Sequence, residues 1–579
     1  MKDGFAAKSV QELTMVMINP SKRFSNPGRD SLLIFFSGIV VFTAGLNREF
    51  ISSETRFALF AQEMLRNGPS FFPTIYGASY PDYPATSTFI IYLISLPFGK
   101  VTPFTATLPT AIVSALVLVI TYQIGATQSR KWGWSAVLFA LSTYLFFSES
   151  RSISLDQYNC LATALCFYLA YSATIYGREK RLWFIPLILV ASFSFRGLVG
   201  LIIPAVVVCT YYVCRREFKK FLLMGILTLG LLCVCSAAML VAAYLQGGET
   251  FVRRVVDAQA AGRIVEGPRF AGSQSRVSHF YYWYGGLSGC AISYPLAVLV
   301  IIAGSRYILR RKDRNYEFIG YMVGWVLIVL IGMSVPSAKK IRYILPIVPA
   351  LSLVAAYLLI DSSPKGILFM TRKTILAVCS FLPLLVSIAA VGILSFGKYF
   401  GLAVDVNFLI VLALLIALSI IARTLSKRLK GYPNQDMVSA VVGVTAFIIV
   451  SIGVVQPINA TLECTRPFVE KVKLLQEEQP GDIIFYQIGP DTEDIKFMVN
   501  YDKPIMPIFI NSPDELLKCR KNSYFIAKKQ RFDHLPEDVK KRTQLRFEGR
   551  IGHRDCVVFS RKFDLREPDS SSISGSSRI

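Results

Sequence analysis

The chain has 579 residues, 53% of them hydrophobic, and a mean hydropathy of +0.48. Apolar runs close to the ~20 residues that span a bilayer recur along it, which excludes an ordinary water-soluble protein and predicts an all-α polytopic membrane protein. The net charge of +24 comes from short basic clusters between these runs. This distribution follows the positive-inside rule, so we expect no nucleic-acid partner.

The basic segment 1–30 is expected to lie in the cytoplasm, and the first span, about 31–46, then leads outward. In the following loop, 47–106, Ser52 or Ser53 can cap a helix that begins near Glu54 and ends at Gly68-Pro69.

The prolines of the run Tyr80–Pro84 predict an extended or turned segment later in the same loop, since each proline restricts the residue before it. Residues 85–100 are apolar but short, and we interpret them as an interfacial helix rather than a span.

Twelve further spans are predicted, for a total of thirteen. They cover about 107–127, 133–147, 157–176, 182–194, 198–214, 221–245, 286–305, 317–335, 343–360, 374–396, 405–422 and 438–457. Every loop after an even-numbered span is basic, which supports this count and an outer C-terminus. The transmembrane module is thus 31–457, with outer loops at 47–106 and 246–284.

The same alternation of inner and outer loops places a set of polar residues on the outer side. The basic residues among them do not follow the positive-inside rule. The candidate carboxylates are Glu54, Asp82 and Asp156, and the candidate cations are Arg56, Arg151, Arg196, Arg269, Arg276, Lys339 and Arg342. Charges at span ends that face one compartment indicate a shared polar cavity. The simpler interpretation of each residue is a solvated loop charge or an ion-pair partner.

The chemistry of the cations suits a phosphate or a pyrophosphate ligand, because arginine forks match phosphate oxygens and lysine adds a point charge. The carboxylates could act as a general base or hold a divalent metal ion, with Asp82 the candidate ligand. Tyr83, beside Asp82, is a further candidate for substrate binding.

Residues 458–565 predict a small extracytoplasmic α/β domain. Its expected helices lie in PFVEKVKLL and SPDELLKC, and its expected strands in GDIIFYQIG, KPIMPIFI, SYFIAKK and RDCVVFSR. Three of the 11 cysteines, Cys464, Cys519 and Cys556, fall in this part, and one disulfide among them is possible. Residues 566–579 are expected to be disordered.

Short motifs occur along the outer side in a fixed order: Glu54-Thr55-Arg56, the turn Tyr80–Pro84, Arg151 to Asp156, Arg196-Gly197, and Lys339 to Pro346. In this order the chain resembles the GT-C superfamily of polyprenyl-phosphate-sugar glycosyltransferases. The branch it resembles most holds the lipid A aminoarabinose transferases (ArnT) and protein O-mannosyltransferase-like enzymes.

The resemblance implies transfer of a sugar from an undecaprenyl phosphate carrier to an acceptor, lipid A first, at the outer face of a bacterial inner membrane. A protein or another envelope glycan is the alternative acceptor. Relative to the family pattern, an Asp is replaced by Ser53, a Lys by Tyr83, and a His by Ser275. These changes leave the sugar and the metal open.

The mechanism that the resemblance implies is a single displacement at the anomeric carbon. Glu54, with Asp156 second, would deprotonate or orient the acceptor, and the cations would hold the departing phosphate. The rival class is a membrane transporter or lipid flippase. Such proteins tend to carry charges at mid-span and internal repeats, and the sequence shows few of the former and no evident repeat.

Overall fold

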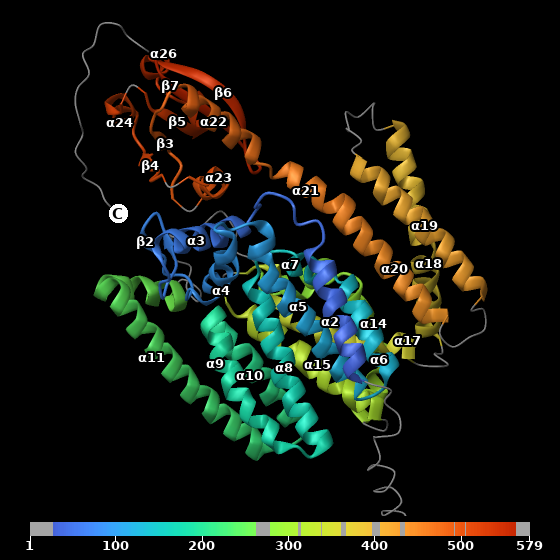
Figure 1. Ribbon diagram of the computed structural model, residues 1–579. Helices are drawn as coiled ribbons and strands as arrows, with labels where there is room; N and C mark the ends of the chain where they lie inside the picture. Colours follow the sequence, from blue (N-terminus) through green and yellow to red (C-terminus); the bar gives the residue numbers. More distant parts are fainter. Residues whose placement is uncertain are drawn as a thin grey trace, which may run out of the picture.

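The computed structural model describes residues 27–261, 278–310, 314–336, 339–360, 366–396, 406–428, 435–490, 492–503, 505–520 and 522–562. A helical bundle forms most of the molecule, and a small domain with a β-sheet sits at one end of it (Figure 1). The predicted fold class, a helical membrane module with a small α/β domain, is confirmed.

The first half of the bundle contains α2 (Pro27–Thr43), α3 (Glu54–Asn67), α4 (Thr86–Ser95), α5 (Pro103–Ala126), α6 (Arg130–Ser142), α7 (Tyr144–Ser150), α8 (Leu155–Tyr176), α9 (Phe184–Arg196), α10 (Leu198–Cys214) and α11 (Phe218–Val256). The second half contains α13 (Tyr281–Gly289), α14 (Ser293–Arg310), α15 (Arg314–Ser334), α16 (Val348–Ala355), α17 (Tyr357–Ile360), α18 (Ile367–Phe396), α19 (Val406–Arg428), α20 (Gln435–Val450) and α21 (Gln456–Leu462).

Seven helices of the described residues are long and apolar enough to cross a membrane, and an eighth is counted if the bent pair α13 and α14 forms one span. Several predicted spans are shorter helices, such as α9 with 13 residues. The count of thirteen therefore stays a prediction. The expected interfacial segment forms the 10-residue α4.

Helix α11 continues beyond the predicted end of its span. Gly247 and Gly248 break its helical geometry, and Gly248 has a positive φ of 65°, which glycine adopts readily. The first part of the predicted outer loop 246–284 is therefore helical as far as Val256, and a π-helical turn, η4 (Asp257–Ala261), follows it. Most of the apolar surface of α11 is exposed, as expected for a helix against lipid.

The C-terminal domain is built on a five-stranded sheet of β3 (Ile483–Tyr486), β4 (Ile508–Ile510), β5 (Tyr524–Lys528), β6 (Thr543–Ile551) and β7 (Arg554–Arg561). The strand order is β4-β3-β5-β7-β6, parallel among the first three and antiparallel among the last three. Helices α22 (Arg466–Glu478) and α23 (Glu493–Tyr501) cover one face. The other face carries α24 (Pro513–Lys518), α25 (Lys529–Asp533) and α26 (Glu537–Lys541).

Four of these strands were predicted, whereas β6 and the helices α23, α25 and α26 were not. The three cysteines of this domain are free, so the disulfide considered from the sequence is not formed.

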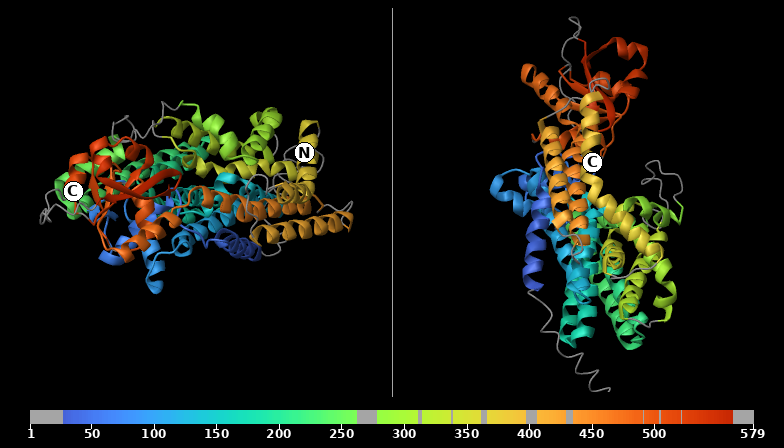
Figure 2. Two further views of the ribbon diagram at one scale, coloured as in Figure 1. Left: turned by 90° about the horizontal axis from the view of Figure 1, so that it is seen from above. Right: turned by 90° about the vertical axis from the view of Figure 1, so that its right-hand side faces the viewer.

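The C-terminal domain lies at one end of the molecule in both views of Figure 2, and its helix α23 contacts α3 (Figure 1). Apolar side chains of α3 share one core with α22, α23 and the sheet. The Gln62 side chain donates to the carbonyl of Val499 at 3.1 Å, and the Tyr76 hydroxyl donates to Asp494 at 2.8 Å. The C-terminal domain thereby fixes the position of the helix that begins at Glu54.

Candidate active site

Helix α3 and the loop after it form one wall of the candidate site. The helix begins at Glu54 and ends before Gly68, as the sequence predicts, although the Ser53 side chain does not cap it. Buried Glu63 accepts hydrogen bonds from Thr74 Oγ1 at 2.6 Å and from the backbone N–H of Tyr76. These bonds hold a short hairpin, β1 (Thr74–Ile75) with β2 (Ala78–Ser79), and so direct the Tyr80–Pro84 turn across the bundle.

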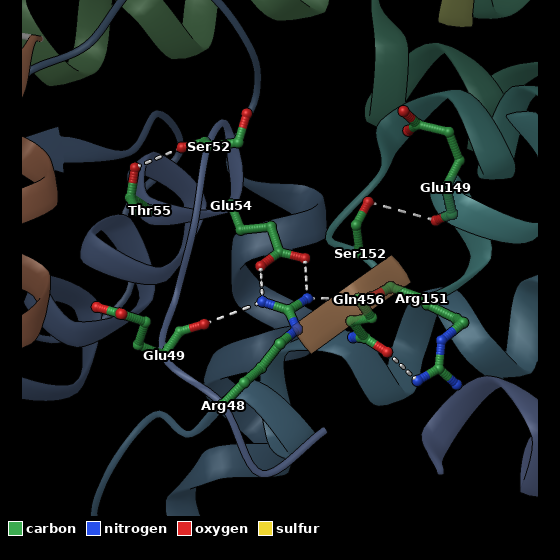
Figure 3. Close-up of polar contacts among 9 residues, drawn as sticks. All are labelled: Arg48, Glu49, Ser52, Glu54, Thr55, Glu149, Arg151, Ser152 and Gln456. Atoms are coloured by element: carbon green, nitrogen blue, oxygen red, sulfur yellow. Dashed lines mark hydrogen bonds and ion pairs between the residues drawn. The ribbon is translucent and has the colours of Figure 1, made fainter. Parts of the chain in front are cut away.

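Glu54 lies in a buried two-pronged ion pair with Arg48, a residue that the sequence analysis did not select (Figure 3). Arg48 Nη1 and Nη2 each donate to one carboxylate oxygen of Glu54 at 2.7 Å. Arg48 also donates to the carbonyl of Arg151 at 3.3 Å. Both carboxylate oxygens of Glu54 are therefore engaged by one fixed cation.

A second buried cluster forms around Asp156, in the first turn of α8, where the helix dipole favours a carboxylate. Arg196 Nε donates to Asp156 Oδ1 at 2.9 Å, and Arg342 Nε lies 3.4 Å from Oδ2. The rings of Tyr83 and Tyr343 lie 5.2 and 5.0 Å from the Arg196 guanidinium carbon. The cluster thus holds two cations and one anion in an aromatic frame.

Arg342 joins this cluster to the start of α3. Its Nη1 donates to the Ser53 hydroxyl at 3.1 Å, next to Glu54. Residues from α8, α9, η5 (Ile341–Ile347) and the start of α3 therefore converge at one rim of the bundle, although more than 280 positions separate the first from the last. We call Asp156, Arg196 and Arg342 the rim cluster.

The turn after Arg196 depends on glycine. Gly197 has a φ of 62°, and a Cβ there would lie 2.9 Å from Gln259 Oε1. Gln259, in η4, is buried and donates to the backbone carbonyl of Asp82. The segment after α11 thus closes against Arg196 on one side and the Tyr80–Pro84 turn on the other.

The other cations lie at different distances from the rim cluster. The Lys340 side chain lies within electrostatic reach of Arg342 and Arg196, and burial together with the charge of Arg342 lowers the pKa of Lys340. Lys339 is buried and donates to the carbonyl of Pro336 at 2.8 Å. Arg56 lies 5.5 Å from the ring centre of Tyr80.

Arg151 points away from the rim cluster. Its Nη1 donates to the carbonyl of Val41 at 2.5 Å, and its Nη2 donates to the carbonyl of Ala44 and to Gln456 (Figure 3). Burial and the charge of Arg48 lower its pKa to about 10. The guanidinium satisfies carbonyls at the end of α2 instead of facing the other cations.

Glu149 is a carboxylate of this region that the sequence analysis did not single out. It lies in the last turn of α7, and its Oε2 accepts a hydrogen bond from Ser154 Oγ at 2.5 Å. Burial raises the pKa of Glu149, Arg342 and Ser154 act in the opposite direction, and Asp156 and Glu54 add to the increase. The sequence feature that could have identified Glu149 was its position two residues before Arg151.

Arg269 and Arg276 lie outside the described residues, as do segments 1–26 and 566–579. Within the described part of the chain, no three His, Cys, Asp or Glu side chains gather closely enough to hold a metal ion. Asp82 lacks partner ligands of this kind among those residues, and its role as a metal ligand stays a prediction.

No family model matches the chain. It is 23% identical over 357 residues to an undecaprenyl phosphate-α-4-amino-4-deoxy-L-arabinose arabinosyl transferase of Proteus mirabilis, covering 60% of this chain and 62% of that protein. It is 24% identical over 351 residues to the Yersinia enterocolitica protein of the same description, covering 59% and 61%. The chain thus matches less than two thirds of the length of these curated relatives.

In structure, the chain is similar to ArnT from Cupriavidus metallidurans. The form bound to undecaprenyl phosphate aligns with a TM-score of 0.66 at 14% identity, over 91% of this chain and 97% of that one. The apo form gives 0.65 at 15% identity over the same shares. The chain therefore has the GT-C fold of ArnT, and its sequence resembles the aminoarabinose transferases.

Proposed function

We propose that this protein is a GT-C glycosyltransferase of a bacterial inner membrane, which moves a sugar from an undecaprenyl phosphate carrier to lipid A at the outer face. Its relatives are named for undecaprenyl-phosphate-linked aminoarabinose transfer, and a protein of the same fold is known bound to undecaprenyl phosphate. The observation that carries the proposal is the rim cluster, where Arg196 and Arg342 meet at the boundary of the apolar bundle.

In this proposal the two arginines bind the phosphate of the carrier, while its lipid tail lies along the apolar helices. Asp156 holds both guanidinium groups in place before the substrate arrives. Tyr83 and Tyr343 restrain Arg196 from the side. Lys340 adds positive charge nearby, and Arg269 and Arg276 are the further cations proposed from the sequence.

Transfer is then a single displacement. The acceptor attacks the anomeric carbon, the bond from that carbon to the phosphate oxygen breaks, and the electron pair stays on the phosphate. The cations stabilise the charge that grows on this leaving group. This effect exceeds ground-state binding because the additional charge appears only as the bond to the anomeric carbon breaks. We propose that Glu54 and Asp156 orient acceptor and cations, and that Asp82 contacts the donor.

The test is mass spectrometry of lipid A from cells that carry or lack this protein. We expect a sugar-sized mass on lipid A that disappears on deletion, returns with the wild-type chain and does not return with Arg196→Ala. Unchanged lipid A would contradict the acceptor. If proteins and other envelope glycans of the same two strains also match, the transferase proposal fails and the flippase class is favoured.

A further inference from the structure

The three carboxylates near the rim cluster have different partners. Glu54 is held by both prongs of Arg48, and Asp156 lies between Arg196 and Arg342. Glu149 instead accepts a hydrogen bond from the Ser154 hydroxyl, and within the described part of the chain it forms no ion pair. Figure 3 shows no contact between its carboxylate and the Arg48–Glu54 pair.

The position of Glu149 is unfavourable for a structural carboxylate. It lies in the last turn of α7, where the helix dipole disfavours negative charge. The carboxylates of Asp156 and Glu54 act on it from α8 and α3, and the opposing cation is Arg342 of η5. Since no ion pair compensates this placement, the side chain costs stability when ionised, which is typical of functional groups.

These surroundings match the requirements of a general base. Such a group needs a free acceptor oxygen and a proton affinity closer to neutrality than that of an exposed carboxylate. Glu54 and Asp156 are less suited, because protonation of either would break a buried ion pair. The half-buried Glu149 can take a proton without leaving an arginine unpaired.

We propose that Glu149 is the proton acceptor of the transfer reaction and that the acceptor nucleophile is a hydroxyl group rather than a phosphate oxygen. This inference rests on the proposed function. A phosphate oxygen is already anionic at neutral pH and needs no base, whereas a hydroxyl must lose its proton as it attacks. A base placed beside the rim cluster is therefore of use only with an acceptor that carries a proton.

The hydroxyl oxygen of the acceptor forms a bond to the anomeric carbon, and its proton passes to the Glu149 carboxylate. The bond between that carbon and the phosphate oxygen breaks, and its electrons leave with the polyprenyl phosphate, which gains one negative charge near Arg196 and Arg342. The proton on Glu149 is released to water before the next turnover.

The first experiment determines the linkage in the product. Lipid A and envelope glycans from cells with the wild-type chain are compared by tandem mass spectrometry before and after mild acid, which cleaves glycosyl phosphates and leaves ordinary glycosides intact. We expect the added sugar to survive the acid and to map to a hydroxyl position. An acid-labile sugar on a phosphate would overturn the inference and leave the proposed function standing.

The second experiment compares Glu149→Gln, Glu149→Asp and the matched control Glu470→Gln in full-length protein. Glu470 is an exposed carboxylate of α22. Gln keeps an oxygen that can accept from Ser154, so Glu149→Gln is expected to fold, as checked by its thermal midpoint in detergent. In membrane vesicles of the expressing cells, which contain their own donor and acceptor, we expect Glu149→Gln to lower the transfer rate by about 100-fold or more.

The pH profile separates a base from a positioning residue. For the wild type, the transfer rate should rise with pH until Glu149 is ionised, and Glu149→Asp should keep a rise with a lower plateau. Glu149→Gln should lose this rise, and Glu470→Gln should match the wild type. A Glu149→Gln variant with the wild-type rate and profile would overturn the assignment. A folded Glu149→Asp variant whose rate no longer rises with pH would overturn it as well.

Discussion

Charged residues are numerous both at the rim of the bundle, around Glu54 and Asp156, and in the C-terminal domain, but the two regions hold them differently. At the rim, the side chains of Arg48, Glu54, Asp156 and Arg196 are each less than 10% exposed and paired at 2.7–2.9 Å. In the C-terminal domain, pairs such as Arg550–Asp555 are more than half exposed. Removing a charge from water is unfavourable, so the buried pairs at the rim lower the folding stability unless their contacts offset this penalty.

The difference indicates a division of labour. In the proposed function the rim orients charged groups for a ligand, and the C-terminal domain supports α3, which forms one wall of the site. Glu49, eight per cent exposed, connects the two regions, because its Oε2 accepts the backbone N–H groups of Thr465 and Arg466 at 3.0 and 2.9 Å. It thereby caps α22 from a loop of the bundle.

The largest effect is expected for Arg196→Ala. The change removes a cation from the proposed phosphate site and leaves Asp156 buried with the longer contact to Arg342 alone. We expect transfer to fall by about 10²–10³-fold and stability to fall by about 3–5 kcal/mol. The loss of transfer is measured as sugar transfer in complemented cells, and the loss of stability is measured by thermal unfolding in detergent. Arg554→Ala, on an exposed residue of the C-terminal domain, is the control and should change neither.

The Arg48–Glu54 pair is predicted to behave as a coupled unit. Arg48→Ala and Glu54→Ala each leave one buried charge without its partner, at a cost of about 3–5 kcal/mol. The double variant removes both charges and should cost less than the sum of the two. A double-mutant cycle on thermal unfolding gives the coupling energy. Additive effects would mean that Arg48 and Glu54 are coupled no more tightly than an ion pair on the surface.

Glu49→Ala should have a smaller effect, centred on the junction between the two regions. Loss of the cap is expected to cost about 0.5–2 kcal/mol and to increase amide hydrogen exchange at the start of α22. Transfer should fall only modestly, since no group of the rim cluster is touched. Glu470→Ala, on the exposed side of the same helix, provides the baseline. Unchanged amide hydrogen exchange at Thr465 and Arg466 would contradict the role of Glu49 in connecting the two regions.

Arg550→Ala is expected to have the smallest effect. Its contact with Asp555, 3.2 Å long, is open to solvent, and such pairs contribute about 0–1 kcal/mol. We expect wild-type transfer and a thermal midpoint close to that of the wild type. A large loss of activity would mean that the C-terminal domain does more than support α3.

Several features of the rim could be predicted from the sequence because local chemistry determines them. Gly68-Pro69 after the apolar face sets the end of α3, and the start at Glu54 was predicted correctly although the Ser53 side chain does not cap the helix. Counting basic loops placed Asp156, Arg196 and Arg342 on one side, and the structure brings these three together. The alternating or apolar patterns of four strands in the C-terminal domain likewise predicted those strands.

The partners of these charges could not be predicted, since they depend on how distant elements pack. Arg48 resembles any juxtamembrane arginine until α3 folds over it, and Arg151 is turned toward α2 by carbonyls that no pattern identifies. Strand β6, TQLRFEGRI, alternates too weakly because both of its faces are partly exposed. Glu149 acquires its character from burial first, and then from the charges that α3, α8 and η5 bring near it.

The central claim is that the rim cluster binds the phosphate of a polyprenyl carrier. Its most direct test is the binding of undecaprenyl phosphate to the purified full-length protein in detergent, measured by native mass spectrometry for the wild type, Arg196→Ala and Arg554→Ala. We predict that Arg196→Ala weakens binding by about tenfold or more, the equivalent of one charge-assisted contact, and that Arg554→Ala binds like the wild type. Equal affinity in all three proteins would contradict the claim.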